Sequence, residues 1–163
     1  MNHAAMVTDA ASFLFEMIPH HQEAVDSSQQ LMMVTQNTEL KNLLQNIIRG
    51  QTSEIIMMKR WLSDYYSWSN YVPQYMKMMR DTTTINDVTT LEKMYIEDMI
   101  PHHQWAVDMA NALLQIFAQQ NPMIKLTTEG ATHREELKQF AQNIIWSQTI
   151  EIQQLKMLLQ TVR

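Results

Sequence analysis

Residues 17–26 read MIPHHQEAVD, and residues 99–108 read MIPHHQWAVD. The surrounding stretches 13–28 and 95–110 align at an offset of 82, with 9 of 16 positions identical. A second pair, 44–62 and 141–159, aligns at an offset of 97, with 10 of 19 positions identical. The chain is therefore an internal duplication of a two-segment unit, and its second copy has the longer internal loop.

The apolar pattern inside each segment has the period of an α-helix. Positions on one stripe step alternately by four and three residues from Leu40 to Trp61, and the same steps recur from Leu137 to Leu158. Such steps keep side chains on one face of a helix. We expect the first and third helices to continue through Pro19 and Pro101 with a kink, because the apolar pattern extends upstream of both prolines. The pattern predicts helices near 9–35, 39–63, 90–119 and 133–161.

Four helices in two hairpins favour an all-α four-helix bundle that forms a single domain over residues 1–163. The duplicated units cover about 9–63 and 90–161. The third and fourth helices are predicted to begin at capping boxes, with Thr89 and Thr132 as the N-caps. The connection 64–89 is rich in Tyr, Trp and Met, so we expect it to pack across the bundle.

The composition excludes several classes of function. The 163 residues include 15 Met and 6 His but no Cys, which excludes disulfides, zinc–thiolate sites and cysteine nucleophiles. With 12 basic and 17 acidic residues, the net charge is −5, and without a basic block we expect no nucleic-acid binding. The lack of an 18-residue apolar run indicates no membrane insertion. The N-terminus shows no signal peptide, as in a cytosolic protein or a mature secreted one.

The duplicated motif places Met and His on the inner side of each first helix. Met17 and His21 share one stripe, His20 lies on the neighbouring stripe, and the second copy repeats the arrangement. Thioether sulfur and neutral imidazole are ligands that favour Cu(I) and its analogue Ag(I). The candidate ligands in the motifs are Met17, His20, His21, Met99, His102 and His103.

A second interpretation gives these histidines a structural role. His21 and His103 would donate hydrogen bonds to Glu54 and Glu151 on the facing helices, and two glutamines, Gln51 and Gln148, would complete a polar network. Such networks fix the register of helices without any chemistry. The sequence leaves both interpretations open for the histidines.

Further Met and His residues lie outside the motifs. His3 and Met6 form a pair near the N-terminus, and the connection carries a cluster of three thioethers. A loop does not need three thioethers for packing, so this cluster is a further candidate metal site. We expect His133, at a helix start, to lie on the surface. The outlying candidate ligands are His3, Met6, Met76, Met78 and Met79.

Two copies of the His-His motif, each followed by Gln-x-x-Glu-Ile, resemble a ferritin-like domain family of formerly unknown function that includes periplasmic copper-resistance proteins. The similar stretches, 13–62 and 95–159, cover nearly the whole chain. The resemblance implies a four-helix bundle, a periplasmic or secreted location, and binding of Cu(I) with Ag(I) as a mimic. It also implies that the His and Met residues of both motifs are the ligands.

Three functions remain open from the sequence. The first is a copper-binding protein without enzymatic turnover, which sequesters Cu(I) or exchanges it with a copper-exporting or copper-accepting protein. The second is a ferritin-like di-metal oxidase, for which the chain offers four acids and two histidines but not the usual Glu-x-x-His spacing. The third is a metal-free helical scaffold whose Met clusters are contact surfaces. The acids and histidines of the second hypothesis are Glu16, His20, Glu54, Asp98, His102 and Glu151.

Overall fold

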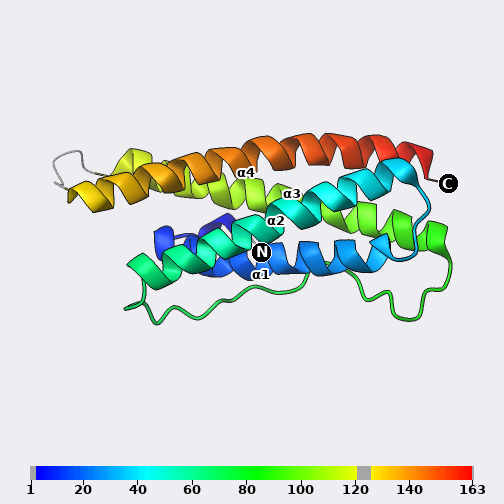
Figure 1. Ribbon diagram of the computed structural model, residues 1–163, viewed down its shortest axis with the longest axis horizontal. Helices are drawn as coiled ribbons and strands as arrows, with labels where there is room; N and C mark the ends of the chain where they lie inside the picture. Colours follow the sequence, from blue (N-terminus) through cyan, green and yellow to red (C-terminus); the bar gives the residue numbers. More distant parts are fainter. Residues whose placement is uncertain (1–2, 121–125, 163) are drawn as a thin grey trace.

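The chain forms four long helices that run side by side (Figure 1). The computed structural model describes residues 3–120 and 126–162, and these ranges contain no β-strand. An all-α four-helix architecture was predicted from the sequence and is confirmed. The elements are a short 3-10 helix η1 (His3–Met6) and the helices α1 (Ala10–Met32), α2 (Thr38–Tyr65), α3 (Val88–Gln119) and α4 (Thr128–Thr161).

The predicted starts of the third and fourth helices are wrong. α3 begins at Val88, because the side chain of Asp87 accepts a hydrogen bond from the Thr90 backbone N–H at 2.9 Å. α4 begins at Thr128, because Thr127 accepts from the Gly130 N–H at 3.0 Å. In each case a side chain further upstream satisfies a free N–H of the first turn, so the helix extends by additional residues at its N-terminus.

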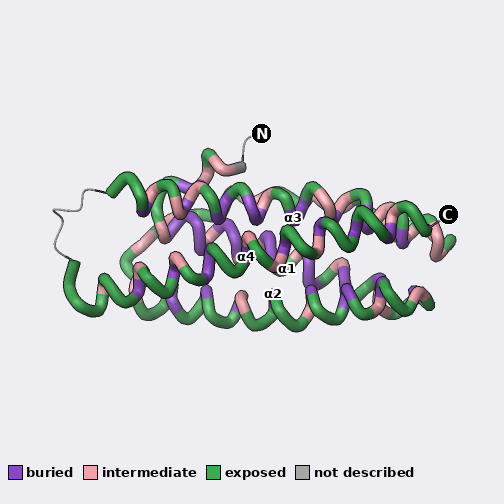
Figure 2. Tube along the Cα trace, turned by 90° about the horizontal axis from the view of Figure 1, so that it is seen from above, coloured by how far each residue is buried: buried purple, intermediate pink, exposed green. Residues whose placement is uncertain are grey.

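The two hairpins associate through their first helices. α1 packs on α2, α3 packs on α4, and α1 lies beside α3. Pro19 and Pro101 both lie inside helices, as predicted. Buried residues line the inner sides of all four helices (Figure 2). None of the helices in the described ranges has the length and apolar character needed to cross a membrane.

The core consists of two apolar clusters rather than one. In α1 the first cluster includes Phe13 and Met17, and the second includes Leu31. In α2 the break falls between Ile47 and Ile55, and α3 and α4 show equivalent breaks. A layer of buried polar side chains separates the clusters at these breaks. We call it the polar layer, and it consists of His20, His21, Gln51, His102, His103 and Gln148.

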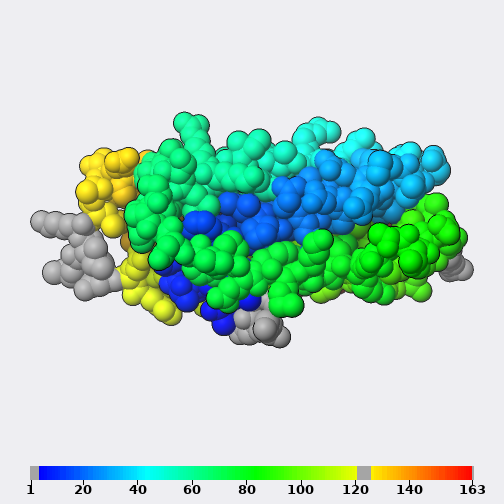
Figure 3. All heavy atoms as spheres, turned by 90° about the horizontal axis from the view of Figure 1, so that it is seen from below, coloured from blue at the N-terminus to red at the C-terminus, as the bar shows by residue number. Residues whose placement is uncertain are grey.

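The connection between the hairpins, residues 66–87, is non-helical, and we call it the strap. It lies along α1 on one face of the bundle (Figure 3). Glu16 of α1 accepts hydrogen bonds from the Tyr71 hydroxyl at 2.6 Å and from the Gln74 N–H at 2.7 Å. At the far end, Arg80 forms an ion pair with Asp98 of α3 at 2.9 Å. The expectation that this segment packs across the bundle is confirmed.

Candidate metal centre

Each hairpin contains one buried histidine that is paired with a glutamate of the neighbouring helix. His21 Nε2 lies 2.6 Å from Glu54 Oε2, and His103 Nε2 lies 2.6 Å from Glu151 Oε2. A carboxylate can only accept, so each imidazole donates its Nε2–H. These are the two pairs that the structural interpretation of the sequence predicted. Because they form in both copies, they lock α1 to α2 and α3 to α4 in the same register.

The other two histidines meet where α1 crosses α3. The rings of His20 and His102 are stacked, with centroids 3.7 Å apart. His20 donates its Nε2–H to the backbone carbonyl of His102 at 2.8 Å. Burial lowers the pKa of His20 well below its ordinary value and the pKa of His102 to about 4. Both rings are therefore neutral at pH 7.

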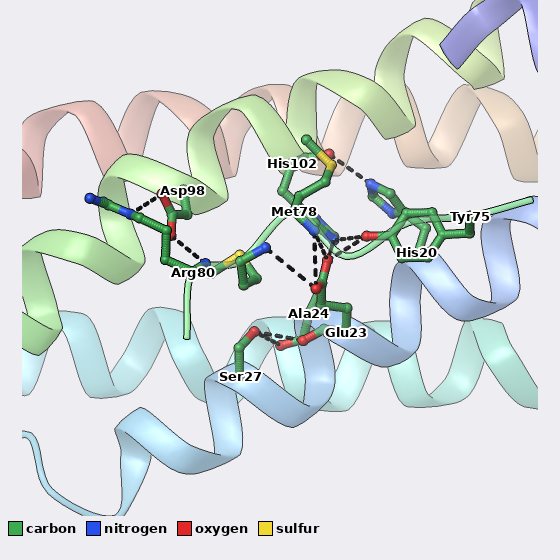
Figure 4. Close-up of polar contacts among 10 residues, drawn as sticks. His20, Glu23, Ala24, Ser27, Tyr75, Met78, Arg80, Asp98 and His102 are labelled. Atoms are coloured by element: carbon green, nitrogen blue, oxygen red, sulfur yellow. Dashed lines mark hydrogen bonds and ion pairs between the residues drawn. The ribbon is translucent and has the colours of Figure 1, made fainter. Parts of the chain in front are cut away.

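Glu23 organises the surroundings of His102. His102 Nε2 lies 3.4 Å from Glu23 Oε1, which also accepts hydrogen bonds from the Tyr75 hydroxyl and from the Met78 N–H (Figure 4). Burial raises the pKa of Glu23, but the hydrogen bonds from His102, Tyr75 and Met78 outweigh it and lower the pKa to about 2. The same carboxylate, together with burial, raises the pKa of Tyr75 far above 10. Glu23 is thus ionised and holds the strap against His102.

All four histidines of the polar layer use the same ring nitrogen for their contacts with the protein. Their Nε2 atoms contact protein groups, whereas their Nδ1 atoms are buried without a hydrogen-bond partner among the described residues. A neutral imidazole carries one N–H, so when Nε2 donates, Nδ1 holds the free lone pair. Metal-ligating histidines usually have this arrangement, in which the second nitrogen donates to a carboxylate or carbonyl. The donor set therefore fits a metal ion.

The predicted role of the two glutamines is wrong within the described residues. Gln51 and Gln148 are buried in the polar layer, as expected. Their side-chain amides make no hydrogen bond to any described residue, however, and so do not complete the network. The reason is geometric, since Glu54 and Glu151 lie one turn further along the helices and take the histidine N–H groups themselves.

The structure brings some of the predicted methionines to this layer and not others. Met17 and Met99 are fully buried one turn before the histidines, but they belong to different apolar clusters. Met78 and Met79 are half-buried in the strap, and both of their backbone N–H groups bond to Glu23. Met76, at 65% exposure, points into solvent and is not part of the layer.

The predicted N-terminal pair lies apart from the motifs. η1 packs against α3, and the side chain of Met6 is half-buried there. The side chain of His3 falls outside the described part of the structure. The pair stays a prediction.

His133 is buried, so the expectation that it lies on the surface is wrong. Its ring stacks on Tyr65 with centroids 3.9 Å apart, and its Nε2 lies 2.8 Å from the Tyr66 hydroxyl. The early start of α4 places His133 more than one turn inside the helix, where it faces the end of α2. Burial lowers its pKa.

The di-metal alternative requires carboxylates and histidines to converge. In the described ranges, no three His, Asp or Glu side chains are arranged to hold a metal ion. The acids proposed for that role are engaged elsewhere, since Glu16 and Asp98 hold the strap while Glu54 pairs with a histidine. The arrangement that the di-metal hypothesis requires is therefore not found among the described residues.

Sequence reasoning missed Glu23 and Tyr75, although the duplication carried a signal for the first. Within 17–26 and 99–108, the copies differ only where Glu23 corresponds to Trp105. Trp105 lies near the same site, with its ring centroid 6.2 Å from that of His20 and 6.0 Å from that of Tyr75. The one unmatched position thus marks where the first copy binds the strap through Glu23, whereas the second copy places Trp105 beside Tyr75.

The chain is similar to a known protein family and to solved structures of one protein, several of them with bound metal. Residues 10–159 match the family described as Domain of unknown function (DUF305). The structure of CopM in its Cu(II)-bound form is 32% identical, covers 94% of this chain and 98% of its own, and has a TM-score of 0.70. CopM in its Cu(I)-bound form is 32% identical, with coverages of 93% and 95% and a TM-score of 0.70.

A third structure, CopM in the Ag-bound form obtained by co-crystallisation, is 34% identical, with coverages of 92% and 94% and a TM-score of 0.68. No curated protein sequence matches the chain. The family match spans most of the chain, and the similarity to CopM extends over nearly the full length of both proteins. The chain therefore belongs to the DUF305 family and is a CopM-like protein.

Proposed function

We propose that this protein binds Cu(I), with Ag(I) as a mimic, through imidazole and thioether ligands, and that it sequesters or transfers copper without enzymatic turnover. The observation that carries the proposal is the set of four buried histidines whose Nδ1 lone pairs have no partner among the described residues. An unpartnered buried polar atom costs on the order of 1–3 kcal/mol. A metal ion that bound these nitrogens would offset that cost.

The chemistry of the site favours a soft ion. The imidazoles of His20 and His102 are neutral, and the nearest thioethers are uncharged, so the ligands bring no net charge into the core. Soft thioethers with imidazoles select Cu(I), whereas hard divalent ions prefer carboxylates. CopM has been solved in Cu(I)- and Ag-bound forms, which supports the same assignment, and also in a Cu(II)-bound form.

Two equivalent sets of ligands follow from the duplication. In each, a methionine precedes a pair of histidines by one helical turn, so sulfur and nitrogen share one helix face. Met78 and Met79 of the strap are further candidates at this layer, because Glu23 holds their backbone beside His102. Met76 and the N-terminal pair would be separate, outlying sites. The proposed sets are Met17, His20 and His21, and Met99, His102 and His103.

The proposed setting is the periplasm or another compartment outside the cytoplasm. Thioethers hold Cu(I) there without forming disulfides, and the chain has no Cys. A copper-exporting or copper-accepting protein would be the partner in transfer. The exposed Met76 is accessible to such a partner.

The test is an anaerobic titration in which the protein competes with a chromogenic chelator for Cu(I). Met17→Leu/Met99→Leu removes both motif thioethers at nearly constant volume, which cores tolerate at a cost below about 1.5 kcal/mol per site. We expect at least about a tenfold loss of affinity, which corresponds to about 1.4 kcal/mol. Met58→Leu, at a fully buried position outside the motifs, is the matched control and should bind as the wild type does.

Two results would contradict the proposal. If the wild-type protein leaves the chelator fully loaded, it does not bind Cu(I) with useful affinity. If the double variant and Met58→Leu bind equally well, the motif thioethers are core residues and not ligands. Unfolding curves of both metal-free variants establish that the fold is retained.

A further inference from the structure

The outer face of α4 carries a second regular stripe, which the core does not use. Between residues 139 and 160 its positions are spaced alternately by four and three residues, as in a helix that packs on another helix. All seven side chains are exposed. We call them the outer stripe, and they are Gln139, Asn143, Trp146, Ile150, Gln153, Met157 and Gln160.

The outer stripe contains no charged residue and several large apolar ones. Trp146 is 71% exposed, Met157 69% and Ile150 40%. The first copy shows that the fold does not require this composition. At the offset of 97, the corresponding residues of α2 are Arg49, Ser53 and Arg60, and they too are exposed. The second copy therefore has an apolar surface at positions where the first has polar or charged side chains.

A shallow groove lies in the middle of the outer stripe. Its volume is about 350 Å³, and it is lined by residues of α4 alone. The apolar members are Ile145, Trp146 and Ile150, and two polar residues, Gln142 and Thr149, complete the lining. Its lining residues span positions 142–150, in the middle of the outer stripe. A side chain from another molecule could enter it without any rearrangement of the bundle.

We propose that the outer stripe is the interface of an antiparallel, two-fold symmetric dimer of this chain. With the two-fold axis near position 148, Trp146 lies opposite the partner's Ile150, and the symmetry repeats this pair. Asn143 then lies opposite the partner's Gln153, so two amides can hydrogen-bond to each other. Gln139 lies opposite the partner's Met157. Every position of the stripe between 139 and 157 thus faces a position of the same stripe, as an isologous interface requires.

A second copy fits this face better than a charged partner does. Each chain has a net charge of −5, but the outer stripe is uncharged, so pairing two copies through it brings no like charges together. The same lack of charge means that the stripe offers no ion pair to a charged partner. The apolar pairs fall at the groove, and the amide pairs lie on either side of it. Because 22 residues of helix span only about 33 Å, the interface is small. We therefore expect a weak dimer that dissociates on dilution.

The proposed dimer leaves the candidate metal centre accessible. In Figure 1, α4 lies along one side of the bundle and the strap along the opposite side. Dimerisation through α4 would therefore not cover Glu23, Tyr75 or the strap methionines. The inference does not depend on copper binding and can be tested on metal-free protein.

The first experiment is sedimentation equilibrium of the metal-free protein over a range of concentrations. We expect the wild type to pass from monomer to dimer as its concentration rises. Trp146→Arg, which installs the residue found at the same position of the first copy, should remain monomeric. Ile56→Gln removes a 65% exposed apolar side chain from α2 and is the matched control, which should dimerise as the wild type does.

The second experiment tests whether the two α4 helices pair antiparallel. Because the chain has no native cysteine, every disulfide formed must involve an introduced cysteine. Under oxidation, the double variant Asn143→Cys/Gln153→Cys should form covalent dimers, whereas each single variant should not. A parallel pairing would instead cross-link Asn143→Cys alone, and that result would overturn the proposed geometry. A wild type that stays monomeric, or a Trp146→Arg variant that still dimerises, would overturn the interface itself. Binding of a monomeric wild type to lipid vesicles would do the same, and would assign the face to a membrane surface.

Discussion

Replacing Glu23 by Gln removes one negative charge from a side chain that is only 8% exposed and that connects three segments of the chain. The Glu23 carboxylate accepts from the Tyr75 hydroxyl and the Met78 N–H, and it pairs with His102. The amide of Gln can keep one acceptor oxygen but no charge, so these hydrogen bonds weaken. We expect the strap to loosen from α1 and the protein to lose stability.

The size of the loss follows from the pKa of Glu23. Folding lowers this pKa from 4.5 to about 2, which corresponds to about 3 kcal/mol in favour of the folded state with the carboxylate ionised. Because the pKa is lowered, the stabilisation is complete above about pH 4.5 and is lost as the pH falls toward 2. Glu23→Gln should therefore cost up to about 3 kcal/mol at pH 7 and progressively less below pH 4.5.

The assay is urea unfolding of wild type and variant, followed by circular dichroism from pH 7 to pH 3. Asp26→Asn is the matched control, because Asp26 is an exposed carboxylate on the same helix that accepts a hydrogen bond from Gln22, which is also exposed. Its cost should stay within about 0.5 kcal/mol. The reasoning is refuted if Glu23→Gln costs less than about 1 kcal/mol at pH 7, or if its cost is the same at every pH.

Three further outcomes are expected. Tyr75→Phe removes one hydrogen bond to the ionised Glu23 and should cost about 1.5–3 kcal/mol in urea unfolding; an unchanged midpoint would contradict the strap contacts. The metal-free wild type should lose at least about 3 kcal/mol as the pH falls from 6.5 to 4, because the folded state keeps His102 neutral while the unfolded chain takes up a proton. The lowered pKa of His20 adds to this loss, and a flat profile over that range would be inconsistent with the burial of the two rings. His133→Ala should lower the free energy of unfolding by about 2–4 kcal/mol, because packing is lost and the Tyr66 hydroxyl loses its hydrogen-bond partner. Replacing a surface histidine would change it very little.

The sequence predicted the repeated histidine–glutamate pairs of the site, although it misassigned the role of the two repeated glutamines. The helical period located four helices, and the duplication identified the motif histidines and their glutamate partners, because both copies place them at the same helical positions. Helix starts were less predictable, since Asp87 and Thr127 compete with neighbouring Thr residues for the same free N–H groups.

The parts that do not repeat could not be predicted. The strap has no periodicity, so its contacts with Glu16 and Glu23 depend on a path across the surface that local sequence does not encode. The pairing of His20 with His102 depends on how the two hairpins dock, which is a tertiary property. His133 was misplaced for a related reason, because its burial follows from Tyr65 and Tyr66 at the end of another helix.

The most direct test of the account is long-range ¹H–¹⁵N NMR of the histidine side chains, recorded on metal-free protein and again with stoichiometric Ag(I). In the metal-free state we expect the four rings of the polar layer to be protonated at Nε2 and bare at Nδ1. On addition of Ag(I), the Nδ1 resonances of the motif histidines should shift and couple to silver, while the Nε2 protons should persist. Coupling at Nε2, or spectra that do not change at these four residues, would contradict the claim that the polar layer is the metal centre.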